Sequence, residues 1–266
     1  MSHLRTLVMG FGLSMLTAFV PFLSSTSWAK CASRYISFSP TKGTKGVPRN
    51  VQLFVSVYGW QRHKAEVILK QGMLVSGAHK VALAIKKTPA SKHSFRKSYF
   101  EIRPQDLLLP GRTYRLVIPA KHKKPMSYFY DRMSSYTFKT GAKADTVAPS
   151  KPTKLSSKGY FYRRMGCGPS KSIPLSLVGS KDKATSVKQL RYLLDVTFSG
   201  AKKQKPKTFT VHTGPSYRAM YTSLGHGMCS GNYLAMRSGV YTIRVRTVDL
   251  AGNISLPSPA VSVKVP

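Results

Sequence analysis

Residues 225–231 contain the residue types best suited to chemistry and read Gly-His-Gly-Met-Cys-Ser-Gly. His226 stands three residues before Cys229, with Met228 between them, a set that could bind copper or place a thiol beside a base. Oxidation of Cys229 would remove both options, because only the thiolate attacks or ligates. The pattern therefore favours a glycine-rich loop with a solvated His226, and a metal-binding or nucleophilic loop is the alternative.

The sequence has 3 cysteines, Cys31, Cys167 and Cys229. Outside the cytoplasm a pair of cysteines is normally oxidised. Cys167 and Cys229 both fall in the second half of the chain, so we predict a disulfide between them. The long loop that it closes would add about 4 kcal/mol of stability on the chain-entropy model. Cys31 then stays free or bridges two molecules, and its pairing with either of the other cysteines remains open.

The carboxylates predict no catalytic site. No two of them are close in sequence, and a glycosidase needs a pair that flanks the scissile bond. The chain also has no G-x-S-x-G elbow, no H-E-x-x-H and no phosphate-binding loop. We therefore predict a non-catalytic protein with no cofactor and no metal, and a small hydrolase is the alternative. The acidic residues are Glu66, Glu101, Asp106, Asp131, Asp145, Asp182, Asp195 and Asp249.

The charge is strongly positive, with 43 lysines and arginines against 8 acidic residues and a net charge of +35. Such a charge favours association with polyanions, and the partners that it suggests are lipopolysaccharide, acidic polysaccharide or extracellular DNA. Aromatic residues accompany two basic clusters, as in surfaces that bind nucleic acid or lipid headgroups. Solvated hairpin loops are the alternative. The candidate contact residues are Lys86, Lys87, Lys92, Arg96, Lys97, Lys121, Lys123, Lys124, Arg163, Arg164, Lys202, Lys203, Lys205 and Lys207.

The N-terminus has the pattern of a secretory signal peptide. A short basic start precedes an apolar stretch over residues 7–23, and small residues stand at Ser27 and Ala29. This arrangement predicts cleavage after Ala29 and a secreted, periplasmic or cell-surface protein. The alternative is an uncleaved membrane anchor, although the stretch is near the lower length limit for a bilayer span.

Short alternating segments predict an all-β fold. They lie between clusters of glycine, proline and serine, the spacing expected of a β-sandwich. Two prolines and small polar residues mark a linker over residues 143–154. We predict two tandem Ig-like antiparallel sandwiches, over residues 30–142 and 155–266. No amphipathic helix is evident, and residues 107–109 allow one helical turn at most. The expected strands are residues 51–58, 81–85, 99–102, 113–118, 173–178, 190–198, 209–212, 240–248 and 261–265.

Residues 37–51 read SFSPTKGTKGVPRNV, which fits the opening S-x-S-P-x-x-G-x-x-G-V-P-x-N. Residues 107–118 and the strand SYTFKTG at residues 135–141 fit the second half of the same pattern. These segments resemble the bacterial Ig-like domain of the SbsA type, found in surface-layer proteins. Residues 121–124 read Lys-His-Lys-Lys where that family often carries an acidic, glycine-rich turn, so no calcium function is carried over from the resemblance.

The second half carries a weaker resemblance. Residues 145–149 and 239–255 resemble the linker and penultimate strand of bacterial fibronectin type III or Ig-like repeats. The resemblance implies a modular extracytoplasmic spacer or adhesive domain, with Tyr241 as a corner tyrosine whose hydroxyl holds a loop. We therefore predict a binding or structural protein that associates with an anionic envelope or matrix polymer. A protein–protein module of a surface assembly, with incidental charge, is the alternative.

Overall fold

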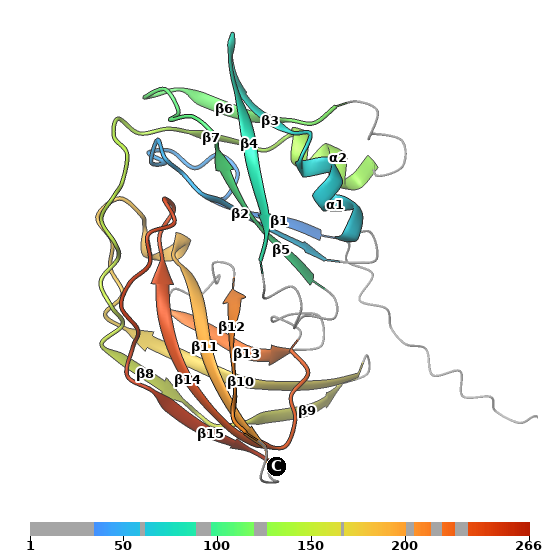
Figure 1. Ribbon diagram of the computed structural model, residues 1–266, viewed down its shortest axis with the longest axis vertical. Coiled ribbons are helices and arrows are strands. Elements are labelled where there is room, and N and C mark those ends of the chain that lie inside the picture. Colours follow the sequence, from blue (N-terminus) through green and yellow to red (C-terminus); the bar gives the residue numbers. More distant parts are fainter. Residues whose placement is uncertain are drawn as a thin grey trace, which may run out of the picture.

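The computed structural model describes residues 35–58, 62–88, 97–119, 127–165, 168–200, 205–213, 220–226 and 234–266. Strands dominate these ranges and pair throughout in antiparallel sheets, so the chain has an all-β, Ig-like sandwich fold. The two halves of the described chain lie one above the other along the long axis (Figure 1). The predicted signal peptide and Cys31 fall outside the described residues. Within these ranges, no helix is both long and apolar enough to cross a bilayer.

The first half forms one curled sheet with the strand order β1-β2-β5-β4-β3-β6-β7. Strand β4 pairs with β3 through its first four residues and with β5 through its last five, so it belongs to both layers of the sandwich. Two short helices lie at one end of this half (Figure 1). The elements are β1 (Tyr35–Ser39), β2 (Leu53–Tyr58), α1 (Arg62–Leu69), β3 (Met73–Ser76), β4 (His79–Lys87), β5 (Lys97–Pro104), β6 (Thr113–Val117), α2 (Ser127–Ser134) and β7 (Thr137–Lys139).

The core of the first half is built by strand alternation. In β2, Leu53, Val55 and Val57 point inward, because successive side chains of a strand face opposite sides of the sheet. Tyr114 of β6 is fully buried, and its hydroxyl accepts a 2.9 Å hydrogen bond from the backbone N–H of Leu109. This bond fixes the turn that leads into β6.

The two helices correct the expectation that the chain has none. Helix α1 buries Ala65, Ile68 and Leu69, whose spacing places them on one helical face. Both helices have only eight residues, too few for helical periodicity to stand out from the surrounding sequence. Residues 107–109, where the sequence allows one helical turn at most, have no helical structure.

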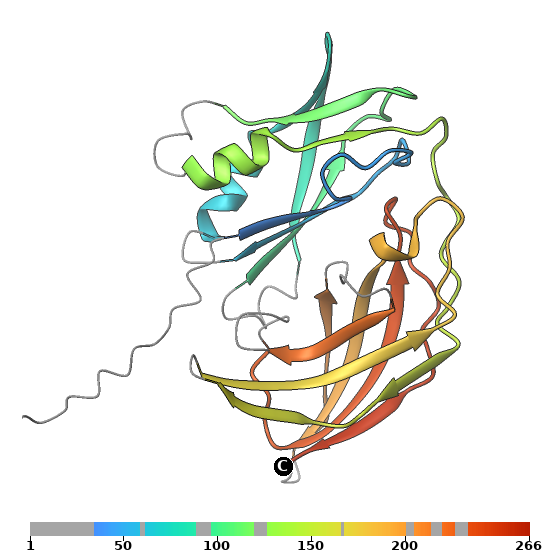
Figure 2. The ribbon, with the colours of Figure 1, turned by 180° about the vertical axis from the view of Figure 1, so that it is seen from behind.

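The second half is a sandwich of two four-stranded sheets. One sheet has the order β13-β10-β8 with β9 also paired to β10, and the other has the order β12-β11-β14-β15. The two sheets face each other across the lower lobe seen from behind (Figure 2). The strands are β8 (Lys154–Ser157), β9 (Phe161–Met165), β10 (Gly168–Val178), β11 (Arg191–Gly200), β12 (Lys207–Thr213), β13 (Tyr221–His226), β14 (Gly239–Val248) and β15 (Val261–Val265).

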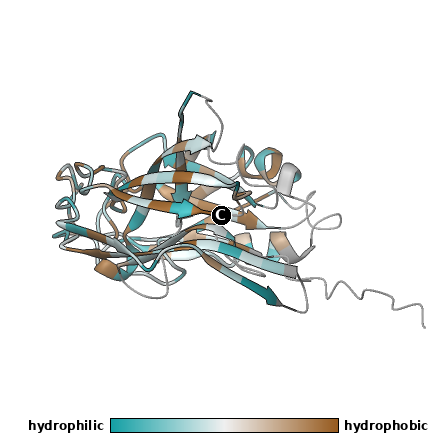
Figure 3. Cartoon of the chain, turned by 90° about the horizontal axis from the view of Figure 1, so that it is seen from below, coloured by the Kyte–Doolittle hydropathy of each residue, from teal (hydrophilic) through white to brown (hydrophobic). Residues whose placement is uncertain are grey.

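Strand β14 shows how the sequence positions this second core. Tyr241, Ile243 and Val245 point inward, while Arg244 and Arg246 lie on the opposite face. The Tyr241 hydroxyl accepts a hydrogen bond from the Arg237 N–H at 2.8 Å and donates to the Arg237 carbonyl at 3.2 Å, which confirms the predicted corner tyrosine. Hydrophobic and hydrophilic residues alternate along many strands (Figure 3). The expected strands are confirmed, with ends shifted by a few residues.

Hydrogen bonds hold the connector between the halves, residues 143–154, at several points. The Asn50 side chain donates to the Asp145 carbonyl at 2.7 Å and accepts from the Asp145 N–H at 2.8 Å. Further along, the backbone N–H of Thr153 donates to the carbonyl of Val178 at the end of β10. The connector is therefore fastened to both halves by hydrogen bonds.

Candidate functional site

The glycine-rich loop singled out in the sequence is described only at its beginning. His226 ends β13, and its Nδ1 lies 3.4 Å from the carbonyl oxygen of Leu234. Cys167 and Cys229 fall outside the described residues, so their disulfide stays a prediction. Among the described residues, His226 belongs to no group of three or more metal-ligating side chains.

The basic candidate residues that the structure describes lie on several sheets. Lys86 and Lys87 end β4, Arg163 and Arg164 lie on β9, and Lys207 begins β12, just after Lys205. All six are exposed. They do not converge on one groove, because these strands belong to three different sheets. The other predicted contact residues fall outside the described ranges, except Lys97: Lys92, Arg96, Lys121, Lys123, Lys124, Lys202 and Lys203.

Lys97 differs from the rest of the predicted set because it is buried. Its side chain is only 8% exposed, and this burial lowers the pKa of its ammonium to about 8. A polymer that approaches from solvent cannot reach the ammonium without local rearrangement. Lys97 is therefore not part of the accessible cationic surface.

Strand β9 combines exposed aromatic and basic side chains, which we call the β9 patch: Phe161, Tyr162, Arg163, Arg164 and, from β10, Lys171. Phe161 and Tyr162 are 44% and 48% exposed. Arg164 Nε donates to the Tyr162 hydroxyl at 3.2 Å, and Lys171 Nζ lies 5.9 Å from the centre of the Tyr162 ring. Cations are thus already gathered around an accessible ring, the arrangement used to bind stacked bases or anionic groups.

A polar junction joins the two halves through β2 and β11. Arg191, 2% exposed, places its guanidinium carbon 4.6 Å from the centre of the Phe54 ring. The His212 ring lies nearly parallel to the Phe54 ring, with the two ring centres 6.1 Å apart. The backbone N–H of Gln52 also donates to the Leu250 carbonyl at 2.7 Å. The halves therefore meet through a specific contact.

Protonation at this junction follows from burial. Burial lowers the pKa of Arg191 to about 10, against the attraction of Glu101 and Asp249, so the guanidinium stays charged at neutral pH. Burial also lowers the pKa of His212 to about 4, and nearby cations such as Arg191 add to the effect. His212 Nδ1 is 3.6 Å from Glu101 Oε1, and at neutral pH this contact joins a neutral imidazole to a carboxylate.

Three carboxylates meet beside this junction, and we call them the acidic cluster. Asp145 belongs to the connector, Asp182 follows β10, and Asp249 follows β14. An oxygen atom of each carboxylate lies within 4.8 Å of one from each of the others. Burial raises the pKa of Asp249, hydrogen bonds from Asn253 oppose this shift, and the charges of Asp145 and Asp182 add to it.

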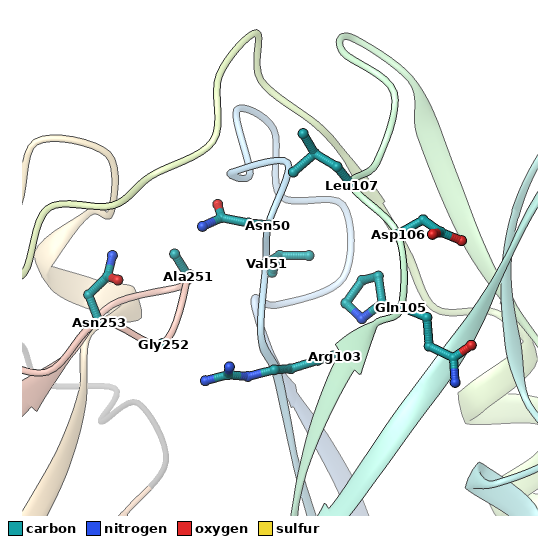
Figure 4. Close-up of a pocket in the computed structure, with 10 residues that line it drawn as sticks. Asn50, Val51, Arg103, Gln105, Asp106, Leu107, Ala251, Gly252 and Asn253 are labelled. Atoms are coloured by element: carbon teal, nitrogen blue, oxygen red, sulfur yellow. The ribbon is translucent and has the colours of Figure 1, made fainter.

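A pocket of about 360 Å³ opens next to the acidic cluster and takes its walls from both halves. Asn50 and Arg103 of the first half extend toward the loop that carries Gly252 and Asn253, whereas Asp106 points away from it (Figure 4). The Asn253 amide nitrogen donates to the Asp145 carbonyl and to Asp249 Oδ2, at 3.1 and 2.9 Å. Asn253 therefore lines the pocket and also hydrogen-bonds to residues of the acidic cluster.

Comparison with known proteins gives a distant structural similarity and no sequence match. No protein-family model matches the sequence, and no curated protein matches it. The crystal structure of the chicken CNTN1 FN1-FN3 domains is similar at 13% sequence identity and a TM-score of 0.29. That match covers 86% of this chain, and this chain spans 66% of the length of that structure. The resemblance to the SbsA type therefore remains a prediction.

Sequence reasoning missed the acidic cluster. The sequence places Asp145 in the predicted linker and Asp249 directly after the strand expected at residues 240–248. In the structure Asp249 stabilises a turn, because its Oδ1 accepts from the Asn253 N–H at 2.9 Å. The available signal was that both residues flank strand ends with turn chemistry. Which strand ends lie together depends on the sheet order, which the sequence did not specify.

Proposed function

We propose that this chain is a non-catalytic, secreted or periplasmic binding module that associates with an anionic polymer of the cell envelope or matrix. The observation that carries the proposal is that most of the carboxylates have partners within the protein. Six of the eight are engaged within the protein, which leaves Asp106 and Asp131 as exposed acidic side chains. Few fully exposed acidic side chains are therefore present to oppose the positive charge of the surface.

The engaged carboxylates each have a specific partner or neighbour. Arg246 pairs with both oxygens of Asp195 at 2.7 and 2.6 Å. Lys70 pairs with Glu66 at 3.0 Å. Glu101 lies against His212 at the junction, and the other three form the acidic cluster. These internal contacts use few of the 43 basic residues, so most of the positive charge is left to solvent and partners.

The β9 patch is the part of this surface best suited to direct contact. Because successive side chains of a strand face opposite sides, Tyr162, Arg164 and Lys171 share one face of β9, and Phe161 and Arg163 lie on the other. Each face offers an aromatic ring to a polymer and a guanidinium that can bind phosphate, sulfate or carboxylate through two hydrogen bonds. The competing explanation is that Arg163 and Arg164 protect an edge strand from pairing with another molecule. A double substitution separates these roles, because loss of protection produces aggregation and loss of a contact weakens polymer binding.

The test measures binding of the purified chain to lipopolysaccharide, an acidic polysaccharide and DNA over a series of salt concentrations. An equally basic, unrelated protein serves as the reference. We expect Arg163→Ser/Arg164→Ser to weaken binding and to reduce the slope of log K against log salt on DNA by about 2. The matched double variant Lys42→Ser/Lys45→Ser removes two exposed lysines of the first half. It should weaken binding less than the β9 double variant, because it removes the same charge without removing the contact strand.

The outcomes are distinct. Equal weakening by the two double variants would refute the β9 patch as the contact strand. Binding of the unchanged chain that only equals the reference protein would refute polymer recognition and favour a protein–protein module whose charge is incidental. The resemblance of residues 37–51 to the SbsA type supports an extracytoplasmic setting, which secretion of a tagged full-length chain would test.

A further inference from the structure

We propose that Asp145, Asp182 and Asp249 bind one divalent cation of the calcium type, which fastens the connector to the second half. These three carboxylates come from three separate segments, yet their oxygen atoms approach within 4.8 Å of one another. In a chain with only 8 acidic residues, such a convergence of negative charge needs compensation. A bound cation supplies it.

The second observation is a buried oxygen with no partner. Asp145 is only 9% exposed, and its Oδ2 makes no hydrogen bond among the described residues. Its Oδ1 is used, because it accepts from the Val147 N–H at 3.1 Å. A buried carboxylate oxygen without a hydrogen bond carries an uncompensated desolvation penalty, which metal coordination removes.

No basic side chain takes this role. Within the described part of the chain, none of the three carboxylates forms an ion pair with a lysine or arginine. Arg191 is attracted by Asp249 but forms no ion pair with it, and two of its nitrogens have no hydrogen-bond partner among the described residues. Arg191 is thus close enough to be felt by Asp249 without forming a direct contact that would neutralise it.

The chemistry of the ligands selects a hard cation. The cluster offers only oxygen atoms, which suit Ca²⁺ and Mg²⁺, whereas zinc prefers nitrogen and sulfur ligands. Two oxygens bound to one Ca²⁺ at about 2.4 Å cannot lie more than about 4.8 Å apart, and the oxygens of the cluster fall within this limit. Calcium also accepts irregular geometry, whereas magnesium demands a near-ideal octahedron.

The position of the cluster gives the cation a structural role. The side chain of Asn50 in the first half forms two hydrogen bonds with the backbone of Asp145, at 2.7 and 2.8 Å. Asp182 and Asp249 stand on loops of the second half. A cation that joins all three therefore fixes the connector, and with it the polar junction between the halves.

The test titrates Ca²⁺ and, separately, Mg²⁺ into the full purified chain after removal of metal with EDTA. Isothermal titration calorimetry at pH 7.5 should give one Ca²⁺ per chain with Kd on the order of 10⁻⁴ M or tighter and at least tenfold weaker Mg²⁺ binding. The Tm should rise with Ca²⁺ concentration. Absence of saturable binding and of any Tm change up to about 10 mM of either ion would overturn the proposal.

Variants separate a metal site from a merely structural cluster. Asp182→Asn changes a half-exposed residue and should weaken Ca²⁺ binding at least tenfold, while Asp131→Asn, an exposed carboxylate of α2, should bind as the unchanged chain does. In EDTA, Asp182→Asn should show an unchanged or higher Tm, because it removes repulsion and keeps an oxygen that accepts from the Ala184 and Thr185 N–H groups, and it should lose the Ca²⁺-dependent rise. Full Ca²⁺ binding by Asp182→Asn would refute these ligands, and the titration of the unchanged chain decides the matter if a variant fails to fold.

Discussion

Replacement of Phe54 tests whether the junction stabilises the whole molecule. Phe54 is 1% exposed and lies outside the two main cores, in a small cluster with Tyr99. Truncation of a buried Phe to Ala costs about 3–5 kcal/mol. The lost interaction with the Arg191 guanidinium, 4.6 Å from the ring centre, is worth about 2 kcal/mol where water is excluded. Because neighbouring effects are not additive, we expect Phe54→Ala to lower the free energy of unfolding by about 5 kcal/mol in total.

The assay is urea unfolding followed by far-UV circular dichroism at pH 7.5. Phe54→Leu keeps most of the apolar volume but loses the ring, so it should cost about half as much as Phe54→Ala. Phe161→Ala is the control, because that ring is 44% exposed and surface changes usually stay within about 0.5 kcal/mol. A loss below about 1 kcal/mol for Phe54→Ala, or a Leu variant as stable as the unchanged chain, would refute the contribution assigned to the junction.

Three further predictions concern single residues. Gly252 has a φ of 88° and a Cβ there would collide with the Gln52 side chain, so Gly252→Ala should lower the Tm more than Gly77→Ala, which has a φ of 56° and open space around it; equal losses in differential scanning calorimetry would contradict the steric argument. The pKa of His212 falls from 6.5 to about 4 on folding. The neutral imidazole therefore contributes fully to the free energy of unfolding above pH 6.5, and this contribution is lost as the pH falls toward 4. The unfolding free energy should therefore drop by up to about 3 kcal/mol more in the unchanged chain than in His212→Asn between pH 7 and 4, and parallel urea-derived profiles would contradict this. Tyr241→Phe should cost about 1–1.5 kcal/mol in urea unfolding through the lost bonds to Arg237, and an unchanged midpoint would show that the hydroxyl is dispensable.

The strands could be predicted because their pattern is local. Residues 240–248 alternate apolar and polar side chains, and the structure places β14 there with Tyr241 and Ile243 inward. The turn at Asp249 and Gly252 could also be predicted, because backbone hydrogen bonding by Asp and a positive φ for Gly follow from residue chemistry alone. Both features needed no knowledge of distant partners.

The junction and the acidic cluster could not be predicted, because they depend on which strand ends come together. Phe54 alternates with the core residues Leu53 and Val55, a pattern that by itself predicts no partner on the other face of the strand. Its burial against Arg191 requires the second half to be docked on β2. Likewise, Asp145 and Asp182 become neighbours only because the connector runs past the end of β10.

The burial of Phe54 and Tyr99 at the junction limits how this chain can be rearranged as a set of modules. If the first half were cut out and placed in another chain, two stacked aromatic rings, with centres 5.7 Å apart, would be left facing water as an adhesive patch. The excised second half would hydrate an Arg191 that is now covered, and would gain a more soluble surface. The two sandwiches are therefore complementary to each other and not interchangeable with other modules. The faces that they bury against each other constrain their order along a longer chain.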